Sequence, residues 1–163
     1  MESLTRLNRG LDELDLWIAS GDGFLAQRAG AISAWSIAEQ VDHSLKVLGT
    51  VFRLIARDEE SPGRLRLAGR LALGLGWFPR GVGKSPRSVL PVVAPASELA
   101  AALGLRRAEL AALAGEPARL ASRRRIYRHP YFGVLTAAEA VRFGAIHTEH
   151  HAKIVRDVIH RLS

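Results

Sequence analysis

Two helix-start signatures constrain the fold of this chain more than any other pattern in its sequence. Ser36 and Glu39 form one S/T-x-x-E pattern, and Thr136 and Glu139 form a second. In this pattern the hydroxyl and the carboxylate each accept a hydrogen bond from a free backbone N–H of the first helical turn. Apolar residues at spacings of three and four follow both patterns, as is typical of an amphipathic helix. The sequence therefore predicts one helix from Ser36 to about Arg57 and another from Thr136 to the C-terminus.

Two further segments carry helical periodicity. Residues 2–20 repeat leucine and isoleucine at intervals of three and four, and residues 97–120 are rich in alanine and leucine. No stretch shows a convincing alternation of apolar and polar residues, so no β-strand is predicted. Residues 58–94 are too long for a simple antiparallel turn, and a short helix over 64–75 is expected within them. The predicted fold is all-α, a four-helix bundle with a long crossover connection between helices 2 and 3, in a single domain over residues 1–163.

Composition narrows the class of protein. A chain of 163 residues with 48% hydrophobic and 24% charged residues has the balance of a globular domain. Because it contains no cysteine, disulfides, thiolate metal sites and a cysteine nucleophile are excluded. Residues 1–6 are acidic and amphipathic, and no run of about 18 apolar residues occurs, so neither a secretory signal nor a membrane span is predicted. A cytoplasmic protein is the expectation.

The positive charge is unevenly distributed. The formal net charge is +7, and six basic residues but no acidic ones lie between Glu60 and Glu98. Such clusters attract phosphate or anionic lipid. Aromatic residues are not interleaved with them as on a single-strand-binding surface, so we favour a solvated surface and expect no nucleic-acid partner. A basic helical module that binds anionic partners through residues 64–87 is the alternative.

Histidines provide a candidate metal site. His147 and His151 lie four residues apart in the last predicted helix, so their side chains project from the same face. On a helical wheel the pair falls in the middle of the apolar stripe, where two neutral imidazoles are hard to satisfy without a common partner. A third imidazole from a facing helix, for which His43 is available, would complete a three-histidine site with open coordination positions. Water or a carboxylate could also satisfy the pair, so spacing alone leaves the metal undecided.

Residues near these histidines have other expected roles. His150 lies at the edge of the apolar stripe and is kept as a candidate substrate contact. Glu39, one turn before His43, is the nearest candidate carboxylate for orienting that ring. His129 precedes a proline and is expected to cap a loop by hydrogen bonding, and Trp35 is expected to anchor packing.

These motifs resemble the DinB/YfiT-like superfamily of small four-helix bundles. The resemblance rests on His43 eight residues after Trp35 and on His147-x-x-x-His151 in the last helix. It is sharper over residues 129–136, His-Pro-Tyr-Phe-Gly-Val-Leu-Thr, which are similar to the segment before the last helix in one branch of that family.

The resemblance extends to residues 79–86, which are similar to the middle loop of that branch, and so covers most of the chain. It implies a divalent metal, nickel or zinc, bound by His43, His147 and His151. Some members are transferases that use a low-molecular-weight thiol, and many have no assigned activity. Two functions therefore stand beside the basic module. One is a metal-dependent transferase or hydrolase that activates a small thiol or water, and the other is a metal-binding bundle without catalysis.

The second predicted helix is apolar over more than half of its circumference, because Val47, Val51 and Leu54 widen its main stripe. This surplus can pack under the 58–94 connection or against a twofold partner. A homodimer is expected, in keeping with the family resemblance.

Overall fold

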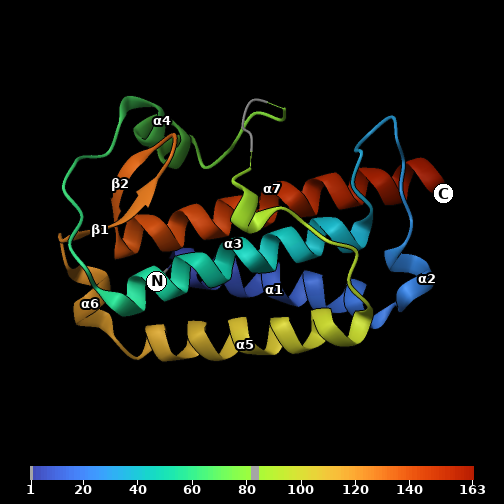
Figure 1. The fold of residues 1–163 in the computed structure, drawn as a ribbon, viewed down its shortest axis with the longest axis horizontal. Coiled ribbons are helices and arrows are strands. Elements are labelled where there is room, and N and C mark those ends of the chain that lie inside the picture. Colours follow the sequence, from blue (N-terminus) through green and yellow to red (C-terminus); the bar gives the residue numbers. More distant parts are fainter. Residues whose placement is uncertain (1, 82–84) are drawn as a thin grey trace.

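The computed structural model describes residues 2–81 and 85–163 (Figure 1). Within these residues it has seven α-helices, one 3-10 helix and a two-stranded sheet. The helices are α1 (Glu2–Ala19), α2 (Asp22–Leu25), α3 (Ile37–Arg57), α4 (Leu67–Leu75), α5 (Ala96–Ala114), α6 (Pro117–Ala121) and α7 (Ala137–Leu162). The 3-10 helix η1 covers Arg87–Val89, and the strands are β1 (Arg125–His129) and β2 (Gly133–Thr136). The prediction of a mainly helical fold is confirmed.

The four long helices α1, α3, α5 and α7 bury their apolar stripes against one another. Both α1 and α3 contact α5 and α7, and Figure 1 shows all four running along the longest axis of the molecule. Leu11, Leu48, Leu103 and Ile146, one from each helix, are all at most 3% exposed in the shared core. None of the described helices combines the length and hydrophobicity that crossing a bilayer requires.

Both predicted capping boxes are formed. The Oγ of Ser36 accepts the backbone N–H of Glu39, and the Glu39 carboxylate accepts the backbone N–H of Ser36 at 2.8 Å. Thr136 and Glu139 make the same pair of bonds before α7, with a Thr136 N–H distance of 2.9 Å. Because these bonds set where each helix begins, they also set which residues face the core.

The prediction that no strands occur is wrong. β1 and β2 form an antiparallel hairpin directly before α7. β1 buries two adjacent residues, Ile126 and Tyr127, and β2 buries three in a row, so neither shows the alternation that identifies a half-buried strand. The connecting turn ends at Gly133 with φ 86°, a left-handed conformation that glycine adopts readily.

The single helix predicted over residues 97–120 is two helices. α5 ends at Ala114, and α6 begins at Pro117, the first position at which a proline fits a helix. Proline has no N–H with which to continue the bonds of α5, so the chain turns at Gly115 and Glu116. The short helix expected over 64–75 is present as α4. Residues 82–84 of the loop that resembles the family's middle loop lie outside the described residues.

The broad apolar arc of α3 is covered within the chain. Val47 is 6% exposed and Val51 is fully buried, while α3 contacts α5, α7, β1 and η1. Packing within the chain therefore covers Val47 and Val51, while Leu54 is half-buried. The arc gives no argument for a homodimer.

Candidate metal centre

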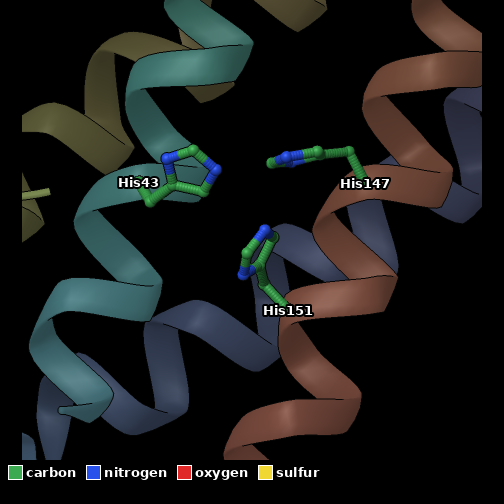
Figure 2. Close-up of side chains that lie close together, drawn as sticks. All are labelled: His43, His147 and His151. Atoms are coloured by element: carbon green, nitrogen blue, oxygen red, sulfur yellow. The ribbon is translucent and has the colours of Figure 1, made fainter. Parts of the chain in front are cut away.

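Three histidines converge between α3 and α7 (Figure 2). One ring nitrogen of each lies within 4.8 Å of a ring nitrogen of the other two. The ring centroid of His43 is 5.0 Å from that of His147 and 4.7 Å from that of His151, and the latter two are 4.5 Å apart. The three histidines singled out from the sequence therefore meet at one point, and the two on α7 reach it from successive turns of the same face.

Close packing of α3 on α7 brings the rings together. Gly144 lies on α7 one turn before His147, and a Cβ added there would come within 2.9 Å of the Cδ2 of Leu48 on α3. The missing side chain therefore lets the two helices approach just beside the histidine cluster. This contact was not predicted, although a glycine on the buried face of a long helix is a sequence signal for close helix packing.

Hydrogen bonds on the outer sides of two rings determine which nitrogen faces the centre. The Nδ1–H of His43 donates to the backbone carbonyl of Val89 at 2.6 Å. The Nδ1–H of His151 donates to the side-chain oxygen of Gln40, also at 2.6 Å. Because these oxygens only accept, each ring carries its proton on Nδ1 and keeps the lone pair of Nε2 free. Imidazoles that bind metals are commonly oriented in this way.

Gln40 is itself held in place. It is 2% exposed, and its Nε2 donates to the Oγ of Ser33 at 2.8 Å. The same Oγ accepts the backbone N–H of Trp35. The loop before α3 therefore orients His151 through Gln40. This support was not predicted, although a glutamine three residues before His43 on the buried side of the helix indicates it.

His147 lacks a comparable partner. Its ring is half-buried, but its Nδ1 is shielded from solvent and has no hydrogen-bond partner within the described residues. The aromatic rings of Phe78 and Phe143 flank it, with centroids 6.5 and 5.5 Å away. An orphaned buried nitrogen is costly, and a cation shared with the neighbouring imidazoles would compensate for it. A donor set of three imidazoles suits a divalent transition metal, so the residues present fit such an ion.

Burial keeps the three imidazoles neutral. It lowers the pKa of His43 below its ordinary value of 6.5, against a smaller opposing effect of the hydrogen bond to Val89. Burial lowers the pKa of His147 and of His151 well below that value, and repulsion between the rings lowers both further. Neutral imidazole is the form that donates a lone pair to a metal. The cluster therefore stays competent to bind a cation at pH values where free histidine would be protonated.

Trp35 and His150 border the cluster. The ring centroid of Trp35 lies 5.0 Å from that of His43 and 6.1 Å from that of His151, on which it stacks. This residue, expected only to anchor packing, is thus a wall of the site. The ring of His150 lies 5.1 Å from that of His151 but outside the converging set.

Of two other expectations, the one for Glu39 is wrong and the one for His129 is confirmed. Glu39 was expected to orient His43, but its carboxylate caps α3 and pairs with Arg28 at 3.0 Å, and the carbonyl of Val89 holds the ring instead. His129 does cap a loop, because its Nδ1 accepts the backbone N–H groups at the β1–β2 turn at 3.2 Å.

Of three comparisons with known proteins, one gave a match. Neither the comparison with curated proteins nor the one with solved structures gave a match. A family model described as the DinB superfamily matches residues 4–155, a span that contains all three converging histidines. The chain belongs to the DinB superfamily.

Proposed function

We propose that this protein binds a divalent transition metal, nickel or zinc, through His43, His147 and His151. The observation that carries the proposal is the convergence of three neutral imidazoles, two of them with the Nδ1 proton held on the outer side. When bound, such a metal lowers the pKa of a thiol or water at its open position and so supplies a nucleophile. The chain has no cysteine to act as a nucleophile itself.

The chain's own residues would position the reaction. The carbonyl of Val89 and the amide of Gln40 fix two of the rings, and the rings of Trp35 and Phe78 lie beside the cluster. His150 lies beside the cluster, and burial lowers its pKa, so its ring is neutral and would contact a small substrate bound there. The substrate we propose is a low-molecular-weight thiol, with water as the alternative nucleophile.

The proposed assembly follows from family membership and the packing of the helices. We propose that α1, α3, α5 and α7 form a four-helix bundle, that residues 58–94 are its crossover connection, and that residues 1–163 fold as a single domain. We also propose a cytoplasmic homodimer. Sedimentation at micromolar concentration tests the dimer, and a monomer near 17.7 kDa would exclude it.

Metal content of protein purified without a histidine tag tests the site. We expect about one equivalent of metal in the wild-type protein and a large loss in His147→Ala and His151→Ala, because each removes one of three donors. His160→Ala is the matched control, since His160 is exposed at the end of the same helix. Near-stoichiometric metal in the His147→Ala, His151→Ala double variant would reject the site.

Catalysis is tested separately from metal binding. Metal-loaded protein incubated with small thiols and electrophiles should form conjugates faster than the metal-free protein does. Equal rates in both forms across a broad panel, in protein that binds metal, would favour the alternative of a metal-binding bundle without catalysis.

A further inference from the structure

The outer face of α4 carries a row of exposed leucines. Leu67, Leu71 and Leu75 follow one another at intervals of four and are 71%, 56% and 74% exposed. The other side of the helix packs on the protein, where Gly69 and Leu73 are buried and Gly69 lies against Phe132 of the β1–β2 turn. Residues four apart are offset by about 40° around a helix. The leucines therefore form one stripe that points away from the core.

Three arginines lie beside this stripe, and one of them, Arg66, donates to the backbone carbonyl of Pro130 at 3.2 Å. Arg64, Arg66 and Arg70, with Leu65 and Leu67, line a hollow of about 360 Å³ at the start of α4. Among the described residues none of the three arginines is paired with a carboxylate, whereas ion pairs hold many arginines elsewhere on the surface. The positive charge of these arginines is therefore available to an anionic partner from outside the chain.

An exposed tryptophan follows the helix. Trp77 is 53% exposed and comes two residues after Leu75, in a segment that has no acidic residue between Glu60 and Glu98. Figure 1 shows α4 at the periphery of the molecule, beside the hairpin and on the side away from α5. Leucine, tryptophan and arginine together are typical of short helices that lie in the interface of an anionic bilayer.

We propose that this surface, the α4 face (Leu67, Leu71, Leu75 and Trp77 with Arg64, Arg66 and Arg70), docks on a bilayer that contains anionic phospholipid. The leucines and the tryptophan would enter the boundary between headgroups and acyl chains, and the arginines would bind lipid phosphates. A nucleic acid would match the arginines but leave the leucine stripe in water. A second copy of this face would oppose arginine to arginine. Docking is a separate activity from the proposed metal function and does not depend on it.

Sedimentation with vesicles tests the docking surface. We expect the protein to bind vesicles of phosphatidylcholine mixed with phosphatidylserine and not vesicles of phosphatidylcholine alone. Leu71→Ser with Leu75→Ser should lower partitioning about tenfold or more, because two apolar side chains are lost. Arg64→Gln with Arg70→Gln should lower it about fivefold for each arginine. All four residues are exposed, so the variants should fold.

The matched controls replace exposed leucines and arginines that lie outside the α4 face. Leu16 and Leu105 are 70% and 60% exposed on α1 and α5, and their double substitution by serine should leave partitioning unchanged. Arg9→Gln with Arg53→Gln alters the net charge equally and should have less than half the effect of the Arg64, Arg70 pair.

Four results would overturn the proposal. They are no binding to either kind of vesicle, equal losses in test and control variants, and duplex DNA binding that needs the arginines but not the leucines. The fourth is a concentration-dependent oligomer that disappears in the Leu71→Ser, Leu75→Ser variant, which would make the face a contact between copies. The His147→Ala variant should bind vesicles as the wild type does, so a failure of the metal site and a failure of docking are told apart.

Discussion

Replacing His147 with leucine should stabilise the metal-free protein and abolish its response to metal. The Nδ1 of this ring is buried without a hydrogen-bond partner in the described part of the chain, beside the rings of Phe78 and Phe143. An unsatisfied buried polar group costs about 1–3 kcal/mol, and an apolar side chain of similar size removes that cost. We therefore expect His147→Leu to raise the free energy of unfolding of the metal-free protein by about 2 kcal/mol.

Thermal unfolding measures both effects. In a chain of this size, 1 kcal/mol shifts the Tm by about 2–4 °C, so the variant should melt about 4–8 °C higher than the wild type in the presence of a chelator. Nickel or zinc at a hundred times its Kd should add about 2.7 kcal/mol to the wild-type protein. The same addition should leave the Tm of the variant unchanged, so the wild type should become the more stable of the two proteins when metal is present.

The control is His160→Leu, at an exposed histidine on the last turn of the same helix. It should change neither the Tm without metal nor the increase on metal addition. A metal-free His147→Leu protein that is less stable than the wild type would refute the argument from the orphaned nitrogen. A variant that still gains stability from metal would refute the place of His147 in the site.

Gln40→Leu should weaken metal affinity about 10–100-fold, measured by titration calorimetry with nickel, because a ligand ring loses the acceptor that orients it. Burial lowers the pKa of His129 to about 4. As pH falls below about 6.5, the unfolded chain is therefore protonated first, and up to roughly 3 kcal/mol of stability is lost between pH 6.5 and 4. Denaturant midpoints over this range should fall less steeply in His129→Gln. Gly133→Ala should lower the Tm, at a cost of about 1–3 kcal/mol, because φ is 86° and the new Cβ would clash with the carbonyl of Arg64. Gly104→Ala, in an open helical position, should not lower it.

Local patterns predicted the elements that are stabilised locally. The capping boxes at Ser36 and Thr136 involve residues only three apart, so the starts of α3 and α7 were predictable from sequence. The hairpin was not, because its strands are stabilised by pairing with each other and by the contact of Leu65 with Gly133. The break between α5 and α6 was hidden by the uniform run of alanine and leucine, although Pro117 marked it.

In the candidate site, too, the features that depend on local spacing were predictable and those that depend on distant contacts were not. The pair on α7 was predictable because helical spacing places both rings on one face. His43 was available as a third imidazole on a facing helix, and the family resemblance implied the same residue. The groups that orient the rings were not predictable. Val89 is 46 residues from His43 in the sequence and reaches it only through the crossover connection. Sequence proximity suggested Glu39 instead, but that carboxylate is already used at the start of its own helix.

The converging histidines also bear on how long the folded chain survives. His43 lies in the first third of the sequence and His147 in the last helix, so more than half of the chain lies between them, although α3 and α7 are side by side (Figure 1). A metal held by both would act as a removable cross-link that closes this long loop. Detachment of α7 would then have to wait for the coordination to break, which slows unfolding and the proteolysis that follows it. The lifetime of the protein in a cell would therefore follow the supply of its metal.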